Sequence, residues 1–398
     1  MRISEAIDLH HLAVQDAANY SEKRFLFDQL ISPRGKHFVG IVGPRGVGKT
    51  VLLKQLAALN DRTFYLSLDT VAPETDVFEL VRRLSEDYGY STFLLDEVHY
   101  LPGIDGTLKK LYDFLDVQVR FTSSMALSLH QSAHDLSRRA RLARLLPFSF
   151  REYLAFRYNE RVSRITLGQL LDKQWEPEHL RAGFRFDAYL RGGLMPFAID
   201  EPDVLPLLEN ILNTIITRDI PKVARLHTDE LEVIQKLMRF IGRSAIDGIN
   251  YSSLSRILGI TKYKAEQYVG LLETAFVLQR AFPAGTNVLK EPKVLMSLPF
   301  RLLYQDFTDA IGGLREDFFA EAMRQAGMSF SYLKSTRGKK TPDYLLDHDG
   351  EKLAIEIGGH GKGREQFKGV TLDRKLIFTH SDRTDGINRP LFLLGYLA

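Results

Sequence analysis

The sequence predicts a multi-domain protein of the α/β class, and three observations support this prediction. The chain has 398 residues, enough for two to four domains. Short apolar strands alternate with helical segments from residue 36 to about 150, as in a parallel sheet covered by helices. Helices then dominate up to residue 283, and a strand–turn–strand pattern lies at 341–363.

The composition narrows the class of protein. Hydrophobic residues make up 44% and charged residues 26%, which fits several folded cores and argues against long disorder. There is no cysteine, so disulfides and thiolate metal sites are excluded. No apolar run approaches the ~20 residues of a membrane span, and the N-terminus lacks a signal-peptide core. We therefore expect a cytoplasmic protein without membrane contact. Its net charge is only +3, so any nucleic-acid surface must come from local patches.

A glycine-rich loop separates the apolar strand 37–42 from the helical segment 49–60. It fits the pattern G-x-x-x-x-G-K-[ST] with Gly43, Pro44, Arg45, Gly46, Val47, Gly48, Lys49 and Thr50. In this pattern backbone N–H groups wrap phosphates, the lysine reaches the β- and γ-phosphates, and the hydroxyl binds Mg²⁺. The loop therefore predicts an ATP site with Mg²⁺, the alternative being a glycine turn that binds nothing.

Two acidic residues follow the apolar strand 92–95. Asp96 and Glu97 stand at its C-terminal end, where ligands of α/β sheets bind. Beside a phosphate-binding loop, we expect Asp96 to hold Mg²⁺, directly or through water. We expect Glu97 to orient and deprotonate the attacking water. An acidic cap on the next turn is the alternative.

Further candidates lie on the next two segments. The strand 117–124 ends in polar residues that are candidates for a contact with the γ-phosphate, namely Thr122, Ser123 and Ser124. Surface serines of no special role are the alternative. The segment 135–156 is rich in arginine, and an arginine inserted into a neighbouring subunit's site stabilises transition-state charge. We select Arg139 for this role, against the alternative of a solvated helix face paired with acids.

The segment 231–283 predicts a winged helix-turn-helix. A helix, a short helix, a glycine turn, a third helix and a strand follow one another. Thr261 can cap the third helix, whose first turn carries Lys262 and Lys264. Between 250 and 301 there are seven basic and three acidic residues, a net charge of +4 that suits phosphate contacts. We expect these two lysines to contact DNA, with packing against protein as the alternative.

The segment 341–363 predicts two strands joined by an Asp-Gly turn. Asp343 opens the first strand and Glu356 lies on the second. Two carboxylates on adjoining strands can share a divalent cation. An acid opposite a basic side chain would give the same sequence pattern.

Taken together, these segments resemble a family of prokaryotic AAA+-type predicted ATPases with a C-terminal PD-(D/E)xK nuclease-like (DUF4143-type) domain. The resemblance rests on GPRGVGKT, FLLDEVHYLPG, LLPFSFREYL, YLRGGLMPF, IITRDI and EIGGHGKGREQFKG. It implies an α/β P-loop NTPase core of the ASCE type with a helical lid, a winged helix-turn-helix domain and an α/β nuclease-like domain. The ATPase residues it implies are Lys49, Thr50, Asp96 and Glu97.

The resemblance also implies domain boundaries and a second site. The expected segments are a helical lead-in 1–35, a P-loop ATPase core 36–155, a helical lid 156–227, a winged helix 228–299 and a nuclease-like domain 300–398. In the nuclease pattern Asp343 and Glu356 fit the two acids, and Glu316 is a candidate third. Gly358 stands where the pattern has a lysine, and Lys362, four residues further on, is the candidate substitute. We therefore expect this domain to lack robust nuclease activity.

The function predicted from the sequence is an ATP-hydrolysing, DNA-associated AAA+ machine that uses ATP and Mg²⁺. We expect a homo-oligomer, with a hexamer as the expected size. Two alternatives stay open: a nucleotide-gated regulator that binds a protein partner, and a nuclease driven by the ATPase. Stimulation of ATP hydrolysis by DNA separates the first hypothesis from the second, and metal-dependent nicking of DNA identifies the third.

Overall fold

The structure is a computed structural model of the chain. It describes all residues except 32–34, 125–137, 247, 286–290, 334–340, 360–366, 368–371 and 373. The chain divides into two compact units. We call Met1–Pro147 the first unit and Phe148–Ala398 the second unit.

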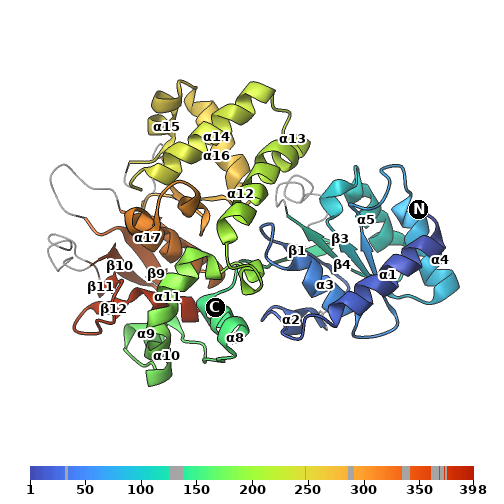
Figure 1. Cartoon of the computed structure of the whole chain (residues 1–398), viewed down its shortest axis with the longest axis horizontal. Coiled ribbons are helices and arrows are strands. Elements are labelled where there is room, and N and C mark those ends of the chain that lie inside the picture. Colours follow the sequence, from blue (N-terminus) through green and yellow to red (C-terminus); the bar gives the residue numbers. More distant parts are fainter. Residues whose placement is uncertain are drawn as a thin grey trace. The chain divides into compact units, whose positions relative to one another are not determined.

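The first unit is a parallel sheet with helices against it (Figure 1). In chain order its elements are α1 (Ile3–Ala17), α2 (Phe27–Ile31), β1 (Phe38–Val42), α3 (Lys49–Ala57), β2 (Thr63–Ser67), α4 (Val77–Tyr88), β3 (Thr92–Asp96), the 3₁₀ turn η1 (Val98–Tyr100), α5 (Ile104–Phe114), β4 (Gln118–Ser123) and β5 (Ala140–Arg144). The strands pair in the order β2-β3-β4-β1-β5, and every pairing is parallel. β1 is buried along its whole length, as expected for an inner strand of a sheet covered on both faces.

The strand order decides where the motifs meet. β4 lies between β1 and β3, and all three strands run in the same direction. Their carboxyl ends therefore share one edge of the sheet, which is where ligands of such sheets bind. The loop after β1, the acids that end β3 and the polar residues that end β4 all reach this edge.

The arginine-rich segment is not one helix. The interpretation of 135–156 as a solvated helix face is wrong for its middle part, because Ala140–Arg144 forms β5 and pairs with β1. This pairing satisfies the backbone groups on the second edge of β1, which a helix would leave without partners. Helix α8 begins only at Phe150, so Arg139 precedes an edge strand.

The lead-in predicted for residues 1–35 contains α1 and α2. The buried positions of α1 are Ala6, His10, Ala13 and Ala17, a helical spacing that packs one face of α1 on β2 and α3. The His10 ring stacks on Phe64 with 4.8 Å between ring centroids, and its Nδ1 accepts a hydrogen bond from the N–H of Tyr65. This buried histidine ties the helix to an edge strand of the sheet.

The second unit begins with short helices. They are α8 (Phe150–Tyr158), α9 (Leu167–Leu171), α10 (Pro177–Arg181), η2 (Ala182–Arg185), α11 (Phe186–Ala188), η3 (Tyr189–Gly193), η4 (Pro196–Ile199), α12 (Val204–Thr214), η5 (Ile215–Asp219) and α13 (Ile220–Val223). The chain kinks at Gly192, whose φ of 121° is not helical. A Cβ atom there would lie 2.4 Å from Val204, and one at Gly193 would lie 2.6 Å from the Tyr153 ring, which explains the pair of glycines in this joint.

Three helices and a β-hairpin follow. They are α14 (Thr228–Arg243), α15 (Tyr251–Leu258), α16 (Lys262–Thr274), β6 (Leu278–Ala281) and β7 (Lys293–Met296), and β6 and β7 are antiparallel. Gly259, with φ of 65°, ends α15, and the Thr261 side chain caps α16 by accepting from the N–H of Lys264. The elements have the order that the sequence predicted, and their interpretation as a winged helix stays a prediction.

The last part of the second unit is a mixed sheet beside a long helix. Its elements are η6 (Phe300–Leu303), α17 (Phe307–Gln325), β8 (Phe330–Tyr332), β9 (Tyr344–His348), β10 (Glu351–Gly358), β11 (Arg374–Thr379), β12 (Asn388–Pro390) and η8 (Leu391–Tyr396). β8, β9 and β10 are antiparallel neighbours, and β11 and β12 continue the sheet in parallel with β10. Asp349 and Gly350 both have positive φ and connect β9 to β10, so the predicted Asp-Gly turn is confirmed. Within the described residues, no helix has the length and apolar character needed to cross a membrane.

Candidate functional site

The loop between β1 and α3 is shaped by its glycines. Gly46 and Gly48 have φ values of 80° and 85°, a left-handed conformation that residues with side chains rarely adopt. Gly43 is required for space, because a Cβ atom there would lie 1.9 Å from the carbonyl oxygen of Leu145. The loop leads into the first turn of α3, whose N–H groups have no partner within the helix. Such a loop at a helix N-terminus is suited to bind an anion.

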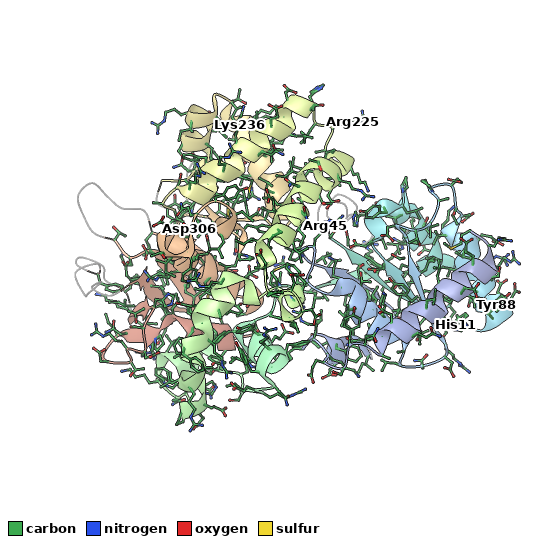
Figure 2. All side chains as sticks on the ribbon, in the orientation of Figure 1. His11, Arg45, Tyr88, Arg225, Lys236 and Asp306 are labelled. Carbon is green, nitrogen blue, oxygen red and sulfur yellow. The ribbon has the colours of Figure 1, made fainter. Side chains whose placement is uncertain are left out.

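The ammonium group of Lys49 lies within this loop. The residue is 4% exposed, and its Nζ donates hydrogen bonds to the carbonyl oxygens of Gly43 at 3.0 Å and Pro44 at 2.9 Å. The positive charge is therefore held where the phosphates of a nucleotide are expected. Val47 is fully buried, and Arg45, labelled in Figure 2, donates to the hydroxyl of Tyr100 at 3.0 Å.

Arg24, in the lead-in, supports the loop and is not among the site residues predicted from the sequence. The buried guanidinium of Arg24 donates to the carbonyl oxygens of Val47 and Leu146, both at 2.7 Å. One side chain thus joins the phosphate-binding loop to the segment that follows β5. No motif marks Arg24, since its role depends on two carbonyl groups that are remote in sequence.

Asp96 is fixed by groups from several elements. Thr122 donates from Oγ1 to one carboxylate oxygen, and Tyr65 donates from its hydroxyl to the other at 2.9 Å. The Thr50 hydroxyl is also hydrogen-bonded to this carboxylate. Asp96 is 1% exposed, and burial raises the pKa of its carboxyl group while the hydrogen bond from Thr122 acts in the opposite direction.

The pair formed by Thr50 and Asp96 fits a magnesium ion. A hydroxyl and a carboxylate are oxygen ligands of the kind Mg²⁺ prefers, and Mg²⁺ usually takes only one or two carboxylates beside phosphates and water. The contact between these two side chains joins the end of the loop to the end of β3. Within the described residues, no three His, Cys, Asp or Glu side chains are grouped to bind a metal without such help.

Glu97 lies at the same edge in an unusual conformation. Its φ and ψ are 50° and 48°, which is uncommon for a residue with a side chain and is held by a hydrogen bond from its N–H to Thr122 Oγ1 at 2.8 Å. Its carboxylate oxygen Oε2 lies 3.2 Å from Nδ1 of His99. Two hydroxyl groups complete the site: that of Ser123, the last residue of β4, lies 3.5 Å from Nδ1 of His99, and that of Ser124 lies 3.4 Å from Nε2.

The sequence-predicted site residues of the first unit, apart from Arg139, therefore meet at one edge of the sheet. Lys49, Thr50, Asp96 and Glu97 share the edge with the predicted polar residues Thr122, Ser123 and Ser124. Thr122 contacts both acids, which the sequence did not predict. Residues 35–154 match the family described as AAA domain. This segment is an AAA-type P-loop domain, and its parallel sheet is that of a P-loop NTPase.

Other comparisons extend over more of the chain. Residues 184–297 match a second family, described as a domain of unknown function (DUF8612), which assigns no activity. An uncharacterized protein of Methanocaldococcus jannaschii is 29% identical over 407 residues, which is 90% of this chain and 85% of the relative.

Three solved structures have low overall similarity. PCH-2 of C. elegans is 18% identical with a TM-score of 0.31, and the match covers 52% of this chain and 61% of PCH-2. ORC1 of Aeropyrum pernix, solved in complex with DNA, is 12% identical with a TM-score of 0.30, covering 79% and 94%. NtrX of Brucella abortus, in complex with ADP, is 15% identical with a TM-score of 0.26, covering 66% and 67%. At these TM-scores no function is transferred from them.

Arg139 forms an ion pair with Asp113 of α5 within its own chain. Its guanidinium donates to both carboxylate oxygens of Asp113 at 2.9 Å, next to the ring of Tyr112. This contact lowers the pKa of the Asp113 carboxyl group. A role in a neighbouring subunit requires Arg139 to exchange Asp113 for a phosphate.

The two lysines predicted to contact DNA are each beside a glutamate. Lys262 lies 2.5 Å from Glu291 Oε1, and Lys264 forms an ion pair with Glu230. Both lysine side chains stay accessible, at 53% and 40% exposure. The hydrogen bond from Lys264 lowers the pKa of Glu230 to about 2.

The acids predicted for a nuclease-like site come from α17, β9 and β10. β9 and β10 are antiparallel, and Tyr344 is paired with Ile355. Asp343, just before Tyr344, and Glu356, just after Ile355, therefore lie at the same end of these two adjoining strands, as predicted. Asp343 accepts from the N–H of Ile357 at 2.7 Å, and Glu356 is 1% exposed.

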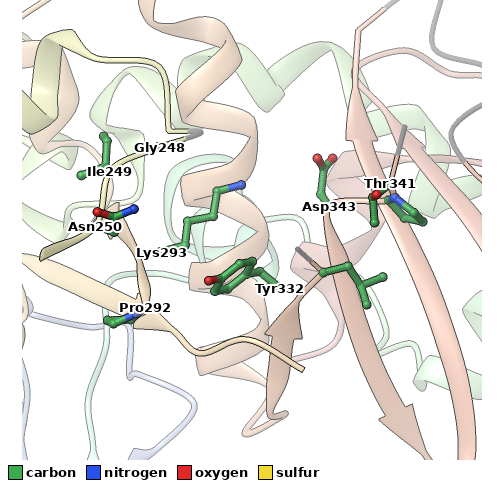
Figure 3. A pocket seen from close by; sticks show the side chains of 10 residues that line it. Gly248, Ile249, Asn250, Pro292, Lys293, Tyr332, Thr341 and Asp343 are labelled. Atoms are coloured by element: carbon green, nitrogen blue, oxygen red, sulfur yellow. The ribbon is translucent and has the colours of Figure 1, made fainter. Parts of the chain in front are cut away.

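Glu316 is held by a lysine that the sequence analysis did not select. Its Oε2 accepts from Nζ of Lys293 at 2.8 Å and from the Tyr344 hydroxyl at 2.7 Å. Lys293 comes from β7 and lines a cavity of about 320 Å³ that Asp343 also lines, as Figure 3 shows. A cation is thus present near these acids although Gly358 lacks one. Lys362 lies outside the described residues.

Proposed function

We propose that this protein is an ATPase that hydrolyses Mg-ATP in its AAA domain. The observation that carries the proposal is the convergence of Lys49, Thr50, Asp96 and Glu97 at one sheet edge, with Thr122 in contact with both acids. Each group has the chemistry that phosphoryl transfer to water requires.

The roles follow from the contacts. When ATP binds, the Lys49 ammonium exchanges its hydrogen bonds with the carbonyl oxygens of Gly43 and Pro44 for hydrogen bonds with phosphate oxygens. The ammonium group is already inside the loop before ATP binds, and its hydrogen bonds with charged phosphates are stronger than those with carbonyl groups. Thr50 and Asp96 would hold Mg²⁺, which when bound neutralises charge on the phosphates. Glu97 accepts the proton of the attacking water, and the hydrogen bond from its N–H to Thr122 fixes its backbone at this edge.

Two variants test this function. Lys49→Ala removes the charge that holds phosphate in the ground state, so we expect tight ATP binding to be lost. Glu97→Gln keeps the size of the side chain and removes the base, so we expect binding to remain and turnover to fall by about 10² or more. Turnover and binding of a fluorescent ATP analogue are measured with Mg²⁺. Hydrolysis by Glu97→Gln at the wild-type rate would contradict the assignment.

We further propose that ATP turnover is coupled to DNA through α16. Lys262 and Lys264 are accessible, and between them Tyr263 is 73% exposed, so the first turn of α16 offers two charges and one aromatic ring. Phosphate contacts by such lysines are independent of base sequence. Their ion pairs with Glu291 and Glu230 also fit the alternative of a protein partner, with nucleotide as the switch.

Salt dependence distinguishes these two partners. Replacing Lys262 and Lys264 by alanine should weaken DNA binding across sequences and lower the slope against log salt by about one unit per contact. Lys236→Ala, an exposed lysine on α14 labelled in Figure 2, serves as the control. ATP turnover is compared without DNA and with single-stranded, duplex and branched DNA. An unchanged slope would favour the protein partner.

The second candidate function is metal-dependent cleavage of DNA in the second unit. The observation that favours it is Lys293, a buried cation beside Glu316 and on one cavity with Asp343. In phosphodiester cleavage two carboxylates hold the metal and a lysine stabilises developing charge. Supercoiled DNA is incubated with Mg²⁺ or Mn²⁺, with and without ATP. We expect no robust cleavage, and nicking that is lost in Asp343→Ala and in Glu356→Ala would establish the nuclease instead.

A further inference from the structure

His99 occupies a buried position between the base and the end of β4. Its side chain is 3% exposed, its Nδ1 lies 3.2 Å from Glu97 Oε2, and its Nε2 lies 3.4 Å from the Ser124 hydroxyl. The Ser123 hydroxyl lies 3.5 Å from Nδ1. Nδ1 of the ring therefore lies near both the proposed base and Ser123, the last residue of β4, while Nε2 lies near Ser124, the residue that follows β4.

The local backbone explains this position. Glu97 adopts a left-handed conformation, and the next three residues, Val98–Tyr100, form a 3₁₀ turn. The chain reverses direction within these residues, so a side chain two positions after Glu97 returns to its carboxylate. The turn is held by Val98, which is fully buried, and by contact between the His99 and Tyr100 rings, whose centroids lie 4.6 Å apart and whose planes are inclined at 51°.

The two acids of the site are held very differently. Asp96 receives hydrogen bonds from Thr122, Tyr65 and Thr50 and has a fixed orientation. Glu97 Oε2 is buried but accepts no hydrogen bond of good geometry within the described residues, and its close contact is with the ring of His99. A carboxylate in this situation turns with little loss of contacts, and the neighbouring ring decides its direction.

We propose that His99 is a positioning residue that aims the Glu97 carboxylate and makes its aim depend on the end of β4. Movement of Ser123 and Ser124 re-aims the ring through its two nitrogens, and the ring moves the base. The rate of ATP hydrolysis thereby depends on the positions of Ser123 and Ser124 at the end of β4. This inference rests on the proposed ATPase function.

Two amide variants separate positioning from packing. In His99→Asn the amide occupies the place of Nδ1 and keeps a polar contact with Glu97. In His99→Gln the amide occupies the place of Nε2 and reaches only toward Ser124. We expect His99→Gln and His99→Ala to lower kcat by about tenfold or more with KM for ATP within about twofold, since ground-state binding is untouched. We expect His99→Asn to retain kcat within about threefold.

The remaining outcomes are also decisive. His11→Gln, on an exposed position of α1 labelled in Figure 2, serves as the matched control, and thermal unfolding shows that each variant folds. Unchanged kcat in His99→Gln, or equal losses in His99→Asn and His99→Ala, would overturn the role of His99 while Glu97→Gln stays inactive. A rise in KM at constant kcat would do the same. Wild-type turnover in Glu97→Gln would overturn the ATPase assignment and this inference together.

Discussion

Two groups of carboxylates in this molecule differ in how they are assembled. In the AAA domain Asp96 and Glu97 are adjacent in sequence, and both contact Thr122 of the neighbouring strand. In the second unit Glu316 and Asp343 come from separate elements, and the cation beside Glu316 comes from β7. The first group belongs to one sheet edge, and the second depends on several elements that are distant in the chain.

This difference shows what a short motif can report. The loop and the acids of the AAA domain are each contained in a few consecutive residues, so their pattern in the sequence reflects the chemistry directly. In the second unit a glycine at 358 suggests a missing cation, but Lys293 supplies a buried ammonium from another element. A gap in a motif therefore does not establish a gap in the site. Four changes, three in the first unit and one in the second, test the two units separately.

The largest expected effect is that of Gly43→Ala in the AAA domain. The new Cβ would lie 1.9 Å from the Leu145 carbonyl oxygen, so the loop backbone must move away from the residue that follows β5. We expect nucleotide affinity to fall by about a thousandfold, or about 4 kcal/mol. Binding of a fluorescent ATP analogue measures the loss. Gly106→Ala on α5, where a Cβ meets nothing within 4 Å, is the control and should bind normally.

Lys293→Met tests the assembly in the second unit. It leaves the Glu316 carboxylate, which is only 17% exposed, without its ammonium partner. Removing one member of a buried ion pair destabilises strongly, and we expect a loss of about 3 kcal/mol in the free energy of unfolding. Chemical denaturation measures it. The double variant Lys293→Met with Glu316→Gln should recover part of the loss, and equal stability of the two variants would show that the pair is not coupled.

His10 predicts how stability of the first unit depends on pH. Burial lowers the pKa of His10 from 6.5 to about 4, so the folded state keeps the ring neutral while the unfolded state binds a proton below 6.5. The contribution of His10 to the free energy of unfolding is fully present above pH 6.5 and is lost as the pH falls toward 4. Between pH 7.5 and 5 the expected loss is about 2 kcal/mol.

The variant His10→Asn isolates this contribution. Its side-chain oxygen can accept from the Tyr65 N–H as Nδ1 does, but it does not titrate. Denaturation at pH 7.5 and 5 should show a smaller difference for the variant than for the wild type. An equal difference in both proteins would assign the pH dependence to other groups.

The smallest expected effect on stability is that of Arg139→Ala. Arg139 and Asp113 are partly exposed, at 21% and 31%, and solvent-exposed pairs of this kind contribute little to stability. If Arg139 acts in a neighbouring subunit, turnover should fall while ATP binding remains. Mixing with Lys49→Ala subunits should restore activity, because one mixed interface combines an intact loop with an intact arginine. Full activity of a strictly monomeric protein would exclude this role and the predicted hexamer.

The sequence by itself determined the AAA domain and the core of its site. The glycine spacing specifies a loop that only residues without side chains can form at Gly43, Gly46 and Gly48, and the lysine and acids follow at fixed distances from strand ends. The Asp-Gly turn between β9 and β10 was equally local. In each case the physical determinant lies within a few residues, so the pattern is visible without the fold.

Only the tertiary structure decided the contacts made across the chain. Arg24 holds a loop 23 residues away, Thr122 fixes two acids from a neighbouring strand, and Lys293 lies 23 residues before the acid it neutralises. The edge strand β5 likewise forms because the backbone N–H and C=O groups on the second edge of β1 need hydrogen-bond partners. The residues of β5 by themselves suggested a helix face. These features depend on which backbone and side-chain groups are left unsatisfied once the core has packed, and one-dimensional patterns do not contain that information.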